Sequence, residues 1–318
     1  MLEVCLLGTA AAQPLPDRAL CSATLRCAGR RILFDCGEGT QVSLRREHIS
    51  PVKIDLIALT HYHGDHIFGL PGLLQSMVLQ ERRDPLWITG PEGLEEAMAP
   101  ILTLTGELSF PLKLLPLPAE GLALASLHPA WPAGARLRAV PTRHRVPSQG
   151  YVFTLARPGR FDVAAARALG VPQTDWSRLQ AGKPVSLGGA WVLPEQVMGP
   201  ERPGLKLVFS GDTAACPELE EAVAGADLLI HEATYADEEE KALLYGHSTF
   251  VQAGQLAARA GVRRLWLCHF SQTIEEPEQA LPLARAQFPT AQCGFDGLSA
   301  TLRFQDPTED AEILSAPD

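Results

Sequence analysis

Three histidines and an aspartate stand within six positions of one another in the stretch LTHYHGDHIFGL, residues 59–70. The apolar run at 54–59 directly precedes them and is typical of a buried strand. His61 and His63, two residues apart after a strand, can point to one metal ion. The Asp65–His66 pair on the following turn can serve a neighbouring ion. The pattern therefore constrains the chain to a fold in which a strand ends at a metal pocket.

The types of ligand indicate what kind of metal site this is. Imidazole nitrogens and carboxylate oxygens suit a borderline divalent ion such as zinc, and a ligand set without cysteine is typical of a catalytic rather than a closed structural site. A lone histidine is more often an ordinary core or surface residue with a satisfied hydrogen bond. Three histidines and an aspartate in the register HxHxDH argue against that interpretation, and their spacing predicts two metal ions.

Short apolar segments alternate with amphipathic ones along the chain, which predicts an α/β protein. The predicted strands are Leu2 to Leu7, Arg31 to Phe34, Leu56 to Leu59, Leu86 to Thr89, Arg136 to Val140, Lys206 to Ser210, Asp227 to His231 and Arg264 to Cys268. The predicted helices include Leu70 to Leu79, Gly93 to Leu104, Thr249 to Ala260 and Pro277 to Gln287. Polar residues stand at strand ends, as at His61, Asp212, His231 and His269. Since such loops converge on one edge of a layered fold, we expect a shared site.

Composition excludes some partners and favours one compartment. The 318 residues carry 27 basic and 37 acidic side chains, so a formal net charge of −10 gives no overall attraction to nucleic acid or to an anionic membrane. Seven scattered cysteines without a CxxC pair fit reduced thiols, which indicates the cytoplasm. The apolar N-terminus has no basic residue before Arg18, so we expect a buried strand rather than a signal peptide. No apolar run approaches the length of a membrane span.

Residues 156–189 differ from the rest of the chain, because five basic residues face two acidic ones and give a local net charge of +3. We interpret this segment as an inserted basic arm. Residues 1–155 and 190–306 are expected to form a single domain, and residues 307–318 a polar, acidic, frayed tail.

HxHxDH after a strand is the signature of the metallo-β-lactamase superfamily, and the chain resembles that superfamily over nearly its whole length. The more specific resemblance is to the ribonuclease Z family of tRNA 3′ endonucleases. It rests on seven motifs in family order, FDCGEGTQ (34–41), LTHYHGDHIFGLPGLL (59–74), RHRVPSQGY (143–151), GDT (211–213), HEATY (231–235), GHST (246–249) and CHFS (268–271). The resemblance implies an α/β (α+β) fold, a four-layer αβ/βα sandwich of two mixed sheets with the metals at one edge.

The resemblance also implies two zinc ions per chain, with manganese or iron as possible substitutes. The implied ligands are His61, His63 and His144 for one ion, Asp65, His66 and His269 for the other, and Asp212 as a bridging carboxylate. Taken alone, His144 and His269 fit ordinary histidines equally well, and the matching flanks favour ligation. Asp35 is expected to hold ligating imidazoles in place. The alternative is that Asp35 is a turn residue and Glu38 a first-turn helix acid.

The activity implied is that of a zinc-dependent phosphodiesterase, an endoribonuclease that removes the 3′ trailer of precursor tRNA by attack of metal-activated hydroxide on the phosphodiester. Asp65 would orient or deprotonate the attacking solvent. His247 would protonate the leaving 3′ oxygen, and Glu232 would keep His247 charged. Alternatively, Glu232 is a helix-start acid and His247 merely precedes a cap at Ser248. His48 and His128 match no motif, and His231 is expected to be structural.

In the family an arm in this interval grips the tRNA, which implies an exosite with phosphate contacts from Arg157, Arg160, Arg178 and Lys183. Two departures stand out. The segment from Gln173 to Trp176 replaces a Gly-Pro-rich stretch, and Gln272 and Thr273 replace an Arg-Tyr pair. Trp176 could stack on a base or anchor the arm on a partner. The family also implies a homodimer. The arm could instead be a solvated amphipathic helix.

Three functions follow from these observations. The first is the tRNA-processing endoribonuclease. The second is a hydrolase of the same fold that acts on small phosphodiesters or other esters, and deletion of residues 158–188 distinguishes the two, because only tRNA cleavage would need the arm. The third is a non-catalytic RNA-binding protein, which would bind less than one metal ion per chain.

Overall fold

The computed structural model describes residues 1–305, and in them the chain separates into two compact units. Unit 1 comprises Met1–Thr154 and Lys206–Arg303. Unit 2 comprises Leu155–Leu205, together with Phe304 and Gln305. The segment predicted as an arm, 156–189, lies within unit 2, which continues past it to Leu205. The predicted acidic tail, 307–318, lies outside the described residues.

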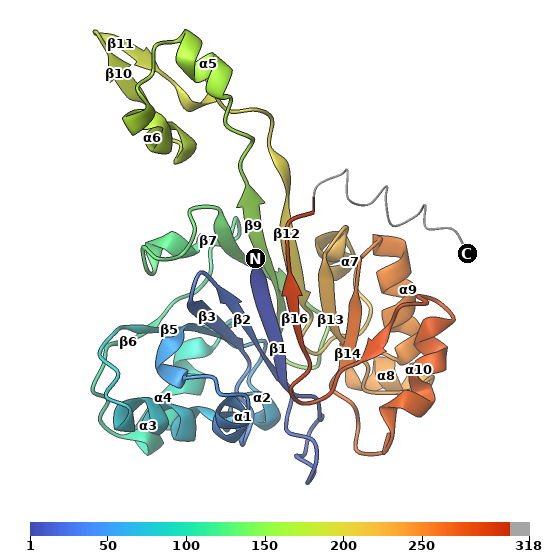
Figure 1. Cartoon of the computed structure of the whole chain (residues 1–318). Coiled ribbons are helices and arrows are strands. Elements are labelled where there is room, and N and C mark those ends of the chain that lie inside the picture. Colours follow the sequence, from blue (N-terminus) through green and yellow to red (C-terminus); the bar gives the residue numbers. More distant parts are fainter. Residues whose placement is uncertain (306–318) are drawn as a thin grey trace. The chain divides into compact units, whose positions relative to one another are not determined.

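Unit 1 contains a first seven-stranded sheet of order β16-β1-β2-β3-β4-β5-β6 (Figure 1). Its strands are β1 (Leu2–Gly8), β2 (Ser22–Cys27), β3 (Arg30–Phe34), β4 (Ile54–Ala58), β5 (Leu86–Thr89), β6 (Leu112–Leu114) and β16 (Ser299–Leu302). Pairing is antiparallel from β16 to β3 and parallel from β3 to β6. Helices α1 (Thr40–Arg46), α3 (Leu70–Leu79) and α4 (Leu94–Thr105) pack their apolar side chains against it.

The second sheet of unit 1 has the order β15-β14-β13-β12-β9-β8-β7. Its strands are β7 (Leu122–Ala123), β8 (Ala135–Pro141), β9 (Gln149–Arg157), β12 (Arg202–Phe209), β13 (Leu228–Glu232), β14 (Leu265–Cys268) and β15 (Gln292–Cys293). Strands β12 to β15 run parallel, while β7 and β8 are antiparallel. Helices α7 (Pro217–Val223), α9 (Phe250–Ala260) and α10 (Pro277–Arg285) share one buried cluster with this sheet.

The two sheets of unit 1 face each other through aromatic side chains. The ring of Phe34 on β3 stacks on that of Phe209 on β12 with 5.3 Å between centroids, and it lies 5.9 Å from the ring of Tyr151 on β9. The Tyr151 hydroxyl donates a hydrogen bond of 2.6 Å to the carbonyl of Leu59. The order of layers is thus helices, sheet, sheet, helices, and the predicted fold class is confirmed.

Local chemistry explains where the predicted elements begin and end. Helix α9 begins after Thr249, whose hydroxyl accepts from the amide of Gln252 at 3.1 Å while the Gln252 side chain accepts from the Thr249 amide. It ends at Gly261, which has a φ of 60° and so adopts the left-handed conformation that favours glycine. Strand β5 and helix α3 have the predicted boundaries. Because β12, β13 and β14 are parallel, their carboxyl ends meet at one edge.

Unit 2 has a small core of its own, formed by Ala166, Val171, Leu179, Val185, Val192 and Val197. Its elements are α5 (Val163–Ala168), α6 (Trp176–Gln180), β10 (Val185–Leu187) and β11 (Ala190–Val192). The last two form a hairpin whose turn, Gly188 and Gly189, needs positive φ at both positions. Trp176 packs on Phe161 and donates its ring N–H to the carbonyl of Val171 at 3.1 Å, so it is partly buried against this core.

Every helix in residues 1–305 is too short or too polar to span a membrane.

Candidate metal centre

Side chains from five separate parts of unit 1 converge beyond the carboxyl ends of the parallel strands. They come from the loop and helix α2 (Gly64–Ile67) after β4, the loop after β8, the end of β12, the segment from β13 to α9, and the residue after β14. The ligand-type residues brought together are His61, His63, Asp65, His66, His144, Asp212, Glu232, His247 and His269. The shared site predicted from strand-end positions is therefore a single cluster.

The three histidines of the first predicted ligand group lie in contact with one another. His63 Nδ1 is 3.0 Å from His61 Nε2 and 3.2 Å from His144 Nε2. The Nδ1 of His144 donates to the carbonyl of Gly246 at 2.7 Å, because a carbonyl can only accept. This contact turns the Nε2 atom of His144 toward His63, and Nε2 is the ring nitrogen left to bind a metal ion.

The second predicted ligand group lies beside the first. His66 Nε2 and His269 Nε2 are 3.3 Å apart, and Asp65 Oδ2 lies 3.5 Å from each. Asp212 Oδ2 is 3.5 Å from His66 Nε2 and 3.7 Å from His61 Nε2, so its carboxylate lies between the two groups. Of the described residues, each group offers three ligand atoms within 4.8 Å of one another.

The donor set fits divalent cations. It consists of imidazole nitrogens and carboxylate oxygens without a thiolate, which suits zinc and related ions in a catalytic site. The surroundings also favour positive charge. Burial by itself lowers the pKa of His66, but Asp212 and Asp35 outweigh it and raise that pKa well above its usual range. Burial by itself raises the pKa of Asp65, yet hydrogen bonds with His269 and His66 hold it below its usual range.

A ring of hydrogen bonds fixes the orientation of the imidazoles. Asp35 is fully buried, accepts from the amide and hydroxyl of Thr60 at 2.7 and 2.8 Å, and pairs with His66 Nδ1 at 2.8 Å. The hydroxyl of Thr234 lies 2.9 Å from Nδ1 of His269. These contacts hold the rings of His66 and His269 so that the Nε2 atoms of the two rings face each other at 3.3 Å. Asp35 thus contacts one of the predicted ligands, His66, whereas Glu38 is exposed at the surface.

Glu232, which is buried, and His247, which is half-buried, form a pair next to both ligand groups. Glu232 Oε1 lies 2.9 Å from His247 Nδ1 and accepts from the Thr213 amide at 2.7 Å. Burial lowers the pKa of His247, but the charge of Glu232 and the hydrogen bond with it outweigh burial and raise that pKa to about 9. Ser248 is not the cap of α9: its hydroxyl donates to the carbonyl of Thr213, and Thr249 caps the helix instead.

Some contacts were not anticipated from the sequence. The backbone amide of Ala12 donates to Asp65 Oδ2 at 2.8 Å, from a residue with a φ of 60°. Ala12, Tyr235 and Gln272 also line a pocket of about 200 Å³ into which Asp65 and His247 project. Thr60 and Thr234 stand inside the quoted motifs, LTH and HEATY, and those motifs were the available signal for them. Nothing in the sequence around Ala12 marks it.

The remaining candidates lie elsewhere. His231 is buried, with Nδ1 bonded to the carbonyl of Glu232 at 2.7 Å, and it belongs to neither ligand group. In unit 2, Arg160, Arg178 and Lys183 are exposed. Arg157 is half-buried, donates to the carbonyl of Gln305 at 3.0 Å and lies over the ring of Phe304.

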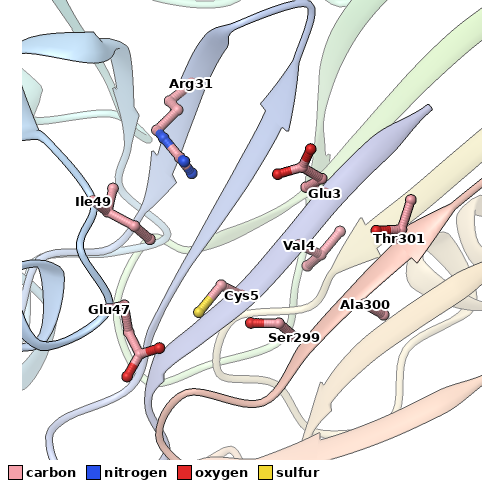
Figure 2. A pocket seen from close by; sticks show the side chains of 9 residues that line it. All are labelled: Glu3, Val4, Cys5, Arg31, Glu47, Ile49, Ser299, Ala300 and Thr301. Carbon is pink, nitrogen blue, oxygen red and sulfur yellow. The ribbon is translucent and has the colours of Figure 1, made fainter.

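A second pocket, of about 310 Å³, opens on β1, β3 and β16 (Figure 2). Its charged side chains are Glu3, Arg31 and Glu47, and Figure 2 shows the sulfur of Cys5 between Glu47 and Ser299. Glu3 forms an ion pair with Arg26. This pocket contains no histidine and shares no residue with the cluster described above. The cluster of histidine and carboxylate side chains described above is therefore the better candidate for a catalytic site.

Comparison with known proteins extends the similarity beyond the cluster. Two family models match, "Anti-Pycsar protein Apyc1" over residues 2–99 and "Beta-lactamase superfamily domain" over residues 152–270. The ribonuclease Z of Agathobacter rectalis is 39% identical over 308 residues, which cover 96% of this chain and 100% of the relative. The ribonuclease Z of Methanothermobacter thermautotrophicus is 37% identical over 313 residues, which cover 98% of this chain and 100% of the relative. The solved structure of the short form of human tRNase Z superimposes with a TM-score of 0.66 at 28% sequence identity. The match covers 95% of this chain and 100% of that one.

Proposed function

The chain belongs to the ribonuclease Z family, and from this premise we propose that it is a metal-dependent endoribonuclease that removes the 3′ trailer of precursor tRNA. The observation that carries the proposal is the pair of Glu232 and His247 beside two ligand groups. Hydrolysis of a tRNA phosphodiester expels the 3′ oxygen as an alkoxide, a poor leaving group that needs a proton to become the 3′ hydroxyl. The pair lies where such a proton could be supplied.

We propose that the centre holds two zinc ions per chain, with manganese or iron as substitutes. His61, His63 and His144 would hold one, Asp65, His66 and His269 the other, and Asp212 both. Metal ions bound there would neutralise charge on the phosphodiester and lower the pKa of the attacking water. The support for this assignment is the geometry of the two groups and the hydrogen bonds that orient their imidazoles.

The chain's own residues would divide the remaining work. Asp65 lines the pocket, and its carboxylate would orient or deprotonate the attacking water. His247, held in its charged form by Glu232, would donate a proton to the leaving 3′ oxygen. The tRNA product would then carry a 3′ hydroxyl and the trailer a 5′ phosphate. Asp35 would act indirectly, by fixing the ring of His66.

We infer that unit 2 contains the tRNA-binding exosite. The support is that a small core orders the unit, while Arg160, Arg178 and Lys183 stay exposed on it. Exposed arginine and lysine side chains bind phosphates without reading the base sequence. Arg157 completes the proposed set. Because Trp176 is partly buried against the core of the unit, an aromatic contact with RNA would come instead from Trp191, which is 63% exposed on β11.

Two further properties are proposed for the whole protein. A homodimer is supported by exposed apolar side chains, Val42 on α1 and Leu79 on α3, which line a shallow depression of about 650 Å³. Sedimentation of the wild type and of a Val42→Glu, Leu79→Glu variant tests this. A cytoplasmic location is supported by seven free thiols, six of them buried.

A second candidate function is hydrolysis of small phosphodiesters or other esters. Gln272 lines the pocket where the family usually carries an Arg-Tyr pair, which favours this candidate. Both candidate functions use the same metal centre. They therefore differ only in the substrate that the protein cleaves.

The deciding experiment is cleavage of an end-labelled precursor tRNA by zinc-loaded protein, beside bis(p-nitrophenyl) phosphate as a small diester. Wild-type protein and the variants His247→Ala and Asp212→Ala are compared. Cleavage at the tRNA 3′ boundary that both substitutions abolish would support the endoribonuclease. Turnover of the small diester with intact tRNA would favour the second candidate. Removal of residues 160–198 is a further control, because the Gly199 amide already bonds to the Arg160 carbonyl at 2.8 Å, so a short linker can close the gap.

A further inference from the structure

The segment between the HEATY and GHST motifs connects Tyr235 to His247, two residues that line the metal pocket. It contains α8 (Glu239–Tyr245), and its two ends are joined, since the Tyr235 amide donates to the Ser248 carbonyl at 3.3 Å and the Phe250 amide donates to the Tyr235 carbonyl at 3.0 Å. Tyr235 and His247, near these ends, both line the pocket. Helix α8 therefore stands directly beside the proposed proton donor.

The last three residues of α8 are apolar and exposed. Leu243 is 57%, Leu244 71% and Tyr245 40% accessible to solvent. The guanidinium of Arg145 lies 5.7 Å from the centre of the Tyr245 ring. A helix that only had to pack against the protein would turn such side chains inward.

Arg145 and Tyr245 adjoin the metal centre through their neighbours in sequence. Arg145 follows His144, and Tyr245 precedes Gly246, whose carbonyl accepts from His144 Nδ1 at 2.7 Å. The ring of His144 is 4.9 Å from that of His247. The exposed arginine and tyrosine are thus one residue away from the contact that orients a predicted ligand.

Tyr235, which lines the pocket, also has a cation over its ring, as Tyr245 does. Its ring lies 6.1 Å from that of His247 at an angle of 71°, and Nζ of Lys241 lies 4.7 Å from its centre. Lys241 also pairs with Glu238 at 3.8 Å, which offsets its charge. Arg145 is therefore the better candidate of the two cations for a phosphate contact.

Tyrosine rings paired with cations suit unpaired nucleotides. Nucleobases stack on aromatic rings regardless of sequence, and arginine adds both a cation–π contact and a charge for the backbone. On a chain with a net charge of −10, a phosphate must be attracted by such local groups. A small diester has no neighbouring nucleotides or phosphates, so it would depend much less on such groups.

Resting on the function proposed above, we propose that Arg145, Tyr235 and Tyr245 form a nucleotide-binding ledge that holds the nucleotides flanking the scissile phosphate. The base next to the cleaved bond stacks on Tyr235. A neighbouring base stacks on Tyr245, and Arg145 binds the phosphate between nucleotides. The ledge places the chain of the RNA across the pocket, in front of His247.

The first test compares kcat/KM for precursor tRNA and for bis(p-nitrophenyl) phosphate in the zinc-loaded, full-length protein. In Tyr245→Ala and in Arg145→Ala, the loss with tRNA is expected to exceed the loss with the small diester by about 5-fold or more. Tyr245→Phe should restore most of the tRNA activity, because it keeps the ring. Lys113→Ala is the matched control, since it removes a cation that lies 4.6 Å from the ring of Trp87 at another edge of unit 1. It should leave both activities unchanged.

The second test uses precursor tRNAs that lack one base on either side of the cleaved bond. Wild-type protein should lose activity when the base that stacks on Tyr245 is removed from the substrate. Tyr245→Ala has already lost that stacking contact, so removal of the same base should not lower its activity further. Equal abasic penalties in wild type and variant at every position tested would overturn the ledge while leaving tRNA cleavage intact. Wild-type protein that hydrolyses the small diester but not the tRNA would overturn the proposed substrate and the ledge with it.

Discussion

The metal centre in unit 1 and the basic surface of unit 2 differ in how firmly their polar side chains are held. At the centre, Asp35 makes three hydrogen bonds and Glu232 several more, almost all from buried groups. In unit 2 a core of small aliphatic residues is ordered, but Arg178 and Lys183 are exposed to solvent. Chemistry needs fixed atoms, whereas binding to a phosphate backbone tolerates mobile charges. We therefore expect losses of different size and kind from the two regions.

The largest effect is expected from Asp212→Ala, because this carboxylate lies between both ligand groups. The variant should lose bound zinc and activity on both precursor tRNA and the small diester. Elemental analysis of purified protein measures the zinc, and circular dichroism serves as the control for folding. A variant with full zinc content and full diester activity would show that Asp212 is not a ligand.

His247→Ala should separate the two substrates. A general acid contributes about 10²- to 10⁴-fold, so the rate of tRNA cleavage should fall by that factor. The p-nitrophenolate leaving group needs no proton, and hydrolysis of the small diester should fall much less. Single-turnover rates of both reactions measure the difference. Equal losses on both substrates would assign His247 to metal binding instead.

Asp35→Asn tests the second layer of the centre. The amide keeps the shape of the side chain but removes the charge that pairs with His66. Loss of such a partner typically costs about 10- to 100-fold in metal affinity or activity. Competition with a zinc chelator measures the affinity, and Glu38→Gln, at an exposed position in the same motif, is the matched control. Equal affinities in the two variants would contradict the role of Asp35.

The pH profile probes Glu232. His247 can donate a proton only below its pKa, which Glu232 raises to about 9, so tRNA cleavage should decline as the pH rises through that value. In Glu232→Gln the charge is gone, the pKa of His247 falls, and the alkaline decline should begin at lower pH. Rates from pH 6 to 10 with a fixed metal concentration test this. If the rate of tRNA cleavage declines at the same pH in Glu232→Gln as in the wild type, a group other than His247 sets the alkaline decline.

The smallest single effects are expected in unit 2. Arg178→Ala and Lys183→Ala should each weaken tRNA binding a few-fold and lower the slope of log affinity against log salt concentration by about one. Activity on the small diester is the internal control. Substitution of Gln180, an exposed neutral residue on α6, should leave the salt dependence as it is. A salt slope that no substitution in unit 2 alters would place the tRNA contacts elsewhere.

The sequence determined the fold class, the family and the residue types of the centre. HxHxDH after an apolar strand, followed by the motifs around His144, Asp212 and His269, indicated which side chains should meet. Helices such as α3 and α9 followed from periodicity and capping residues, which act over a few positions. These features are local in sequence, so a single chain displays them directly.

Only the tertiary structure decided which long-range contacts hold those side chains. It brought the amide of Ala12 to Asp65 and the carbonyl of Gly246 to His144, contacts made by backbone groups that every residue carries. It also placed Trp176 against the core of unit 2 and left Tyr245 exposed beside Arg145. A residue's type states what it can bind, but its neighbours depend on how distant strands pair, and that is a property of the folded chain as a whole.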